Sequence, residues 1–161
     1  MKSCHKIFLP LVLGGMALLT ACDSSTLGLD SAGQRAIQTP SGTSIIRKTD
    51  QALVSQGKAV FEQHCATCHG DRAQGDPQWR KRGPDGLFPP PPLDGSGHAW
   101  HHPTRQLREM ISNGSPPGQG KMPAWGDKLT SAEIDAVIAW FQSLWPDPVY
   151  AAWFDREQRF Q

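Results

Sequence analysis

No apolar run in this sequence reaches the roughly 20 residues that a membrane-spanning helix requires. The chain has only 4 cysteines in 161 residues, too few to build its fold from disulfide bonds. Its formal net charge of +1 lacks the basic excess of a nucleic-acid-binding protein. Apolar residues make up only 38% of the sequence. These shortages favour one small domain with a core that is completed by something other than protein.

Glycine and proline are abundant by contrast, with 16 and 14 residues, which predicts short elements joined by long loops. Helical periodicity is clear where Asp50 provides an N-cap, and again where Thr130 and Glu133 form a capping box. No segment alternates as a strand does, so we expect an all-α domain of three to five helices. The helices are predicted at 50–64, 103–112 and 130–145, with a further one within 146–161.

The N-terminal segment has the pattern of an export signal. Two lysines precede an apolar stretch from Ile7 to Leu19, which is too short to cross a membrane. It ends in Leu-Thr-Ala-Cys, which resembles a bacterial lipobox with Cys22 as the lipidated residue. Several acyl chains on one cysteine would hold the protein at a bilayer. We therefore expect a periplasmic, lipid-anchored protein, with Asp23 favouring the inner membrane.

These patterns divide the chain into four parts. The segment after Cys22 is rich in Ser, Thr, Gly and Gln and has no helical or strand period, which is typical of a flexible tether. The expected parts are a signal peptide at 1–21, a lipid-anchored tether at 22–49, a folded domain at 50–148 and a C-terminal extension at 149–161.

The strongest chemical motif is Cys65-Ala66-Thr67-Cys68-His69. A Cys-x-x-Cys-His run is the attachment site of a c-type haem, in which two thiols bind one porphyrin edge and the histidine binds iron. A thioredoxin-like redox pair would need a βαβ pattern, which is absent. A zinc site would need about four ligands, and no second Cys/His pair has the required spacing, although His98, His101 and His102 remain as conceivable contributors.

With this motif in place, the sequence resembles the class I (monohaem) c-type cytochromes over about residues 50–145. Gly57 and Phe61 match the first helix of that family, Lys121-Met122-Pro123 matches its distal-methionine loop, and Trp140 matches an aromatic position of its last helix. The resemblance implies a cytochrome c-like fold around one covalent haem c. It also implies that Gly57 is the small residue at the crossing of the first and last helices.

The sixth ligand of the iron decides between electron transfer and ligand binding. Met122 lies in a loop bounded by Gly and Pro and is the predicted axial ligand opposite His69, whereas Met110 is expected to fill the core from the middle helix. Bis-histidine ligation through His98, His101 or His102 is the alternative.

The resemblance also implies residues around the haem. The carbonyl of Pro91 or Pro92 is expected to accept the free N–H of His69, and four consecutive prolines leave the register open. Leu93 is expected on the haem face and Trp100 near its propionate edge. The stretch 72–88 is longer and more charged than the family usually has, which fits either a solvated charge run or a partner-docking surface.

The sequence therefore predicts a monomeric, membrane-tethered electron carrier that exchanges electrons with redox partner proteins, binds no small-molecule substrate and is not an enzyme. Two alternatives stay open: a haem c subunit of a larger membrane-associated oxidoreductase, and a haem sensor or enzyme with a displaceable sixth ligand.

Overall fold

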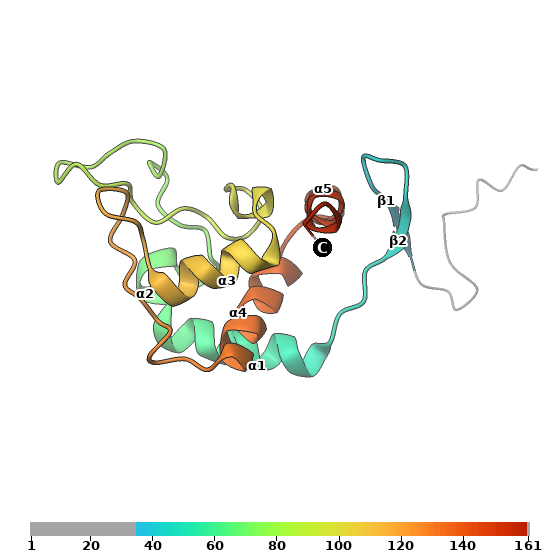
Figure 1. The fold of residues 1–161 in the computed structure, drawn as a ribbon, viewed down its shortest axis with the longest axis horizontal. Helices are drawn as coiled ribbons and strands as arrows, with labels where there is room; N and C mark the ends of the chain where they lie inside the picture. Colours follow the sequence, from blue (N-terminus) through green and yellow to red (C-terminus); the bar gives the residue numbers. More distant parts are fainter. Residues whose placement is uncertain (1–34, 161) are drawn as a thin grey trace, which may run out of the picture.

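The helical core of this computed structural model, which describes residues 35–160, is formed by two crossing helices (Figure 1). Helix α1 (Gln51–His64) and helix α4 (Ser131–Ser143) make the most extensive contact between elements. Their N-termini are as predicted: Asp50 accepts from the amides of Ala52 and Leu53, and Thr130 and Glu133 form the complete capping box. Both caps satisfy amides that a helix leaves unpaired in its first turn.

Gly57 lies at this helix crossing, as the resemblance implied. A Cβ added there would lie 1.9 Å from the Ala136 carbonyl oxygen and 2.9 Å from the Trp140 Cβ. The absence of a side chain therefore lets the two backbones touch. Next to the contact, the rings of Phe61 and Trp140 pack with their centroids 4.1 Å apart.

The remaining helices are short and lie around this pair. Helix α3 begins directly after Pro103 and ends at Gly114, which has a φ of 76°. Within the described residues, no helix is both long and apolar enough to be a candidate membrane span. The elements are α2 (Ala66–His69), the 3-10 turn η1 (Ala99–His101), α3 (Thr104–Asn113) and α5 (Asp147–Gln158).

A β-hairpin precedes α1, in a region where we expected only a flexible tether without strands. Strands β1 (Ala36–Gln38) and β2 (Ser44–Ile46) pair antiparallel, and Ile37 and Ile45 pack on Ala151 of α5. The expectation of an irregular segment was wrong for these residues because the hairpin is stabilised by α5, more than 100 positions later in the chain. Residues 1–21 and Cys22 lie outside the described residues.

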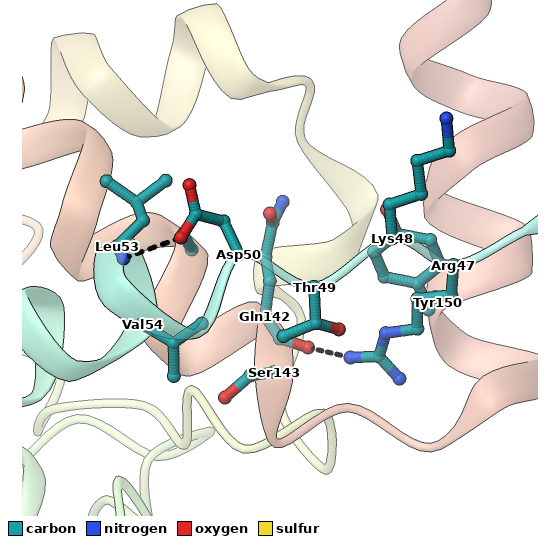
Figure 2. Close-up of a pocket in the computed structure, with 10 residues that line it drawn as sticks. Arg47, Lys48, Thr49, Asp50, Leu53, Val54, Gln142, Ser143 and Tyr150 are labelled. Carbon is teal, nitrogen blue, oxygen red and sulfur yellow. Dashed lines mark hydrogen bonds between the residues drawn. The ribbon is translucent and has the colours of Figure 1, made fainter.

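Arg47 connects the hairpin to the helical core. Its guanidinium donates to the carbonyls of Gln142 and Trp145 (the latter at 2.7 Å) and lies 4.4 Å from the ring centroid of Tyr150. Figure 2 shows this arginine beside the end of α4 and Tyr150, across the pocket from Asp50. A cation at the C-terminal end of a helix also interacts favourably with the helix dipole.

Candidate haem site

The two motif cysteines lie at the junction of α1 and α2. The Cys65 amide donates to the Phe61 carbonyl at 2.8 Å, which ends α1, and Cys68 lies one turn further on. Residues three apart on a helical turn share a face. Both thiols are free of a disulfide, with Cys65 half-buried and Cys68 exposed. Burial, together with neighbouring Cys68, raises the pKa of the Cys65 thiol to about 11.

His69 is held in one orientation by the proline segment. It is only 8% exposed, and its Nδ1 lies 3.0 Å from the Pro91 carbonyl oxygen. A carbonyl only accepts, so Nδ1 carries the proton and Nε2 keeps its lone pair. Burial lowers the pKa of His69, and the bond to Pro91 opposes that shift. The result is a neutral imidazole with a free Nε2, the form that binds a metal.

The structure shows which of the four consecutive prolines accepts from His69, a point that the sequence left open. The His69 ring is bonded to Pro91, whereas the Pro92 carbonyl lies against Gly97, where an added Cβ would be 2.2 Å from the oxygen. Two more backbone bonds hold the segment: the Asp76 amide donates to Pro90 at 2.9 Å, and the Leu93 amide donates to Ala73 at 2.7 Å.

Leu93 and Trp100 both lie half-buried against the core. The Leu93 carbonyl accepts from the Trp145 indole at 2.8 Å. Trp100 donates its indole N–H to the Gly97 carbonyl at 3.1 Å. The indole N–H of Trp100, a residue that we expected near the propionate edge, is thus bonded within the protein.

Met122 lies half-buried in a loop that closes on the end of α3. The Ser115 amide donates to the Met122 carbonyl at 2.9 Å, and the Met122 amide donates to the Ser115 hydroxyl at 3.3 Å. Three residues after Met122, the ring of Trp125 packs against the ring of His64, with the two centroids 5.2 Å apart. The loop that carries Met122 is therefore fixed at its base.

Met110 differs from the expectation that it fills the core. Its side chain is 40% exposed, whereas Leu107 is buried and Ile111 packs partly against the core. The helix itself contacts chiefly α4. Packing therefore gives no account of this methionine.

The candidate ligands His98, His101 and His102 all pack against other aromatic rings. The His98 ring stacks on Trp79 at 5.0 Å, and His102 meets His98 edge-on at 5.6 Å. The ring of His101 lies 3.8 Å from that of Trp100. Over the described part of the chain, no group of three or more His, Cys, Asp or Glu residues is arranged to hold a metal ion.

The charged side chains of the stretch 72–88 are largely exposed, as in a solvated charge run, but Arg82 also makes specific contacts. Its Nη1 donates to the carbonyl of Gly86 at 2.5 Å and of Gly118 at 2.6 Å. The sequence held no signal for this role, since Arg80, Lys81 and Arg82 are adjacent and chemically alike. The long-range contact with Gly118 sets Arg82 apart.

These residues fit a covalent haem. Two unpaired thiols share one helical turn, and directly after them a neutral imidazole has its Nδ1 occupied and its Nε2 available. A redox disulfide would leave this oriented histidine unexplained, and a zinc site would need further ligands, which are not gathered anywhere in the described residues. The motif and the fold together define a c-type cytochrome domain.

Comparison with known proteins identifies the family. Residues 52–141 match the family described as "Cytochrome C oxidase, cbb3-type, subunit III", and the chain belongs to this family. The domain has a cytochrome c-like fold and carries one covalently bound haem c, since the sequence has a single Cys-x-x-Cys-His motif.

Curated relatives include "Cbb3-type cytochrome c oxidase subunit CcoP" of Azospirillum sp. (strain B510), which is 34% identical over 61% of this chain and 31% of its own length. "Cbb3-type cytochrome c oxidase subunit FixP" of Bradyrhizobium sp. (strain ORS 278) is 35% identical over 55% of this chain and 26% of its own. The chain thus spans about a third or less of the length of these relatives. The solved cytochrome CL of Methylophaga aminisulfidivorans aligns with 70% of this chain and 82% of its own, with a TM-score of 0.39 and 21% identity.

Proposed function

We propose that this protein is a monohaem electron carrier of class I type, with Cys65 and Cys68 as thioether links and His69 and Met122 as axial ligands. The observation that carries the proposal is the bond between His69 Nδ1 and the Pro91 carbonyl. It orients the ring and raises the basicity of Nε2, as hydrogen bonds to a metal-bound histidine generally do.

The haem supplies an iron that cycles between ferric and ferrous forms. The protein's own residues decide what that iron can do. A soft thioether from Met122 favours the ferrous form and raises the reduction potential. With both axial positions filled by side chains, neither oxygen nor peroxide has a place to bind, so the site passes electrons and breaks no bonds.

We further propose that lipidation of Cys22 tethers the domain to the periplasmic face of the inner membrane. A tether raises the local concentration of the carrier near membrane-bound donors and acceptors. Removing the thiol by Cys22→Ser should release the protein from membranes, and an unchanged membrane fraction would refute the anchor.

A second candidate is favoured by the relatives, which are by name subunits of respiratory complexes. The protein would then be the haem c subunit of a larger membrane oxidoreductase. Mild detergent extraction followed by purification distinguishes the two: a stoichiometric partner supports the subunit, and a monomeric product supports the free carrier.

Axial ligation is tested by removing each methionine in turn. In the oxidised holo-protein, Met122→Ala should abolish the sulfur-to-iron charge-transfer band. Met110→Ala is the matched control, since this exposed methionine should leave the band unchanged. Loss of the band in the Met110 variant instead would overturn the assignment.

Carbon monoxide tests the remaining alternative, a sensor or enzyme. The reduced protein should bind the gas slowly and incompletely at neutral pH because Met122 must first leave the iron. Rapid and complete binding would refute the closed site.

A further inference from the structure

Residues 82–91 connect the loop that bears Met122 to the residue that orients His69. Arg82 donates to the Gly118 carbonyl at 2.6 Å, and the Phe88 amide donates to the Gln119 carbonyl at 3.0 Å. Three residues after Phe88, the Pro91 carbonyl accepts the hydrogen bond from His69 Nδ1. In Figure 1 the green loop that contains this segment lies beside the orange loop that precedes α4.

The segment is stiff at both ends. Four consecutive prolines, 89–92, favour an extended polyproline helix with little conformational freedom. Before them, the Gly83 amide donates to the Leu87 carbonyl at 2.8 Å, and the Arg82 guanidinium lies 4.3 Å from the centroid of the Phe88 ring. The Arg82 guanidinium is thus held in place by the turn at residues 83–88, with which it also forms a hydrogen bond through Gly86.

Two further contacts join this turn to the distal loop. Asp85 forms an ion pair with Lys121, the residue before Met122. This pair is exposed and therefore weak. The Arg82–Gly118 hydrogen bond is exposed too, and it acts together with the backbone bond from Phe88 to Gln119. These contacts hold the tip of a loop whose base is held by Ser115.

We propose that residues 82–91 form a strut that sets the position of Met122 relative to His69, with Arg82 as a positioning residue for the iron–sulfur bond. This inference rests on the proposed ligation by Met122. A free distal loop would let the thioether leave the iron easily, whereas a loop fixed to the same rigid segment as His69 keeps it in place.

The first test asks whether Arg82 stabilises the loop at 115–122, whichever residue binds the iron. Hydrogen exchange in the oxidised holo-protein is compared between wild type and Arg82→Ala, in peptides covering 115–122 and, as reference, 104–113. Losing one solvent-exposed hydrogen bond of ordinary strength predicts about fivefold faster exchange in 115–122 alone. Unchanged exchange there would overturn the proposal even if Met122 is the ligand.

The second test measures the effect on the iron. Imidazole displaces the methionine, and loss of the charge-transfer band gives its apparent affinity. Arg82→Ala should bind imidazole about fivefold more tightly. The control is Arg80→Ala, since Arg80 stacks on Trp79 at 4.1 Å and makes no hydrogen bond within the described residues; it should behave as wild type.

The outcomes separate the two proposals. If Met122→Ala keeps the charge-transfer band, the proposed ligation by Met122 fails. The hydrogen-exchange result for 115–122 then decides by itself whether residues 82–91 hold the loop. If that band is lost as expected but Arg82→Ala matches wild type in imidazole affinity, the ligation stands and the strut is refuted. A matching increase in the Arg80 variant would also refute it, because the effect would then be one of general charge.

Discussion

Adding a methyl group at Gly57 tests the helix crossing that supports the site. In Gly57→Ala the new Cβ would lie 1.9 Å from the Ala136 carbonyl oxygen and 2.4 Å from its carbonyl carbon. Both atoms belong to the backbone, so no side chain can rotate away. Ordinary van der Waals contact begins near 3.4 Å. The two helices α1 and α4 must therefore separate by about 1.5 Å, the difference between 3.4 Å and the 1.9 Å to the carbonyl oxygen.

The magnitude follows from two opposing effects. Overpacking of a tight core costs up to about 3 kcal/mol, and replacing glycine by alanine within a helix returns about 1 kcal/mol. The separation also weakens the contact between Phe61 and Trp140, because dispersion falls steeply with distance. We therefore expect a net loss of about 2 kcal/mol, or about 8–16 °C in the melting temperature of a domain of this size.

The assay is thermal unfolding of the holo-protein by circular dichroism, at matched haem content. The control is Ser55→Ala, an exposed position on the same helix, which should change stability by no more than about 0.5 kcal/mol. A Gly57→Ala protein as stable as this control would refute the close crossing of α1 and α4.

Three further predictions concern the caps and the hairpin. Thr130→Ala removes the hydroxyl that accepts from the Glu133 amide at 3.2 Å and should cost about 1 kcal/mol in urea unfolding; no loss would contradict the capping role. Hydrogen bonds from Thr130 lower the pKa of Glu133, so this carboxylate stabilises the fold above its unfolded pKa of about 4.3, and that contribution is lost as the pH falls through the lower folded value. Glu133→Gln should therefore reduce the loss of stability on acidification, as melting temperatures at neutral and acid pH would show, and an unchanged loss would contradict this. Arg47→Ala should expose residues 35–49 to limited proteolysis while the helical core resists, because the hairpin loses its link to Gln142 and Trp145; equal resistance of that segment would refute the link.

The sequence predicted the local features well. The starts of α1 and α4 and the break at Gly114 agree with the structure because capping groups and glycine act on residues one turn away. The position of Gly57 was also correct, although it depended on the family resemblance and not on periodicity. In each case the determining contact is either local or tied to a recognisable motif.

The errors and open points share one cause, since each depends on contacts between distant parts of the chain. The hairpin at 36–46 forms on α5, and Met110 is exposed although its helix packs on α4. Likewise, Arg82 donates to the carbonyl of Gly118, 36 positions away. Local pattern carries no information on such pairs.

The sequence by itself determined the chemistry, because the spacing of Cys65, Cys68 and His69 within one helical turn already specifies attachment of one haem. The tertiary structure decided how that chemistry is held. It selected Pro91 among four prolines as the partner of His69, and it placed the segment before those prolines against the loop of Met122. The physical reason is that covalent attachment needs only neighbours along the chain, whereas orienting His69 and placing the loop of Met122 require distant segments to be fixed against each other.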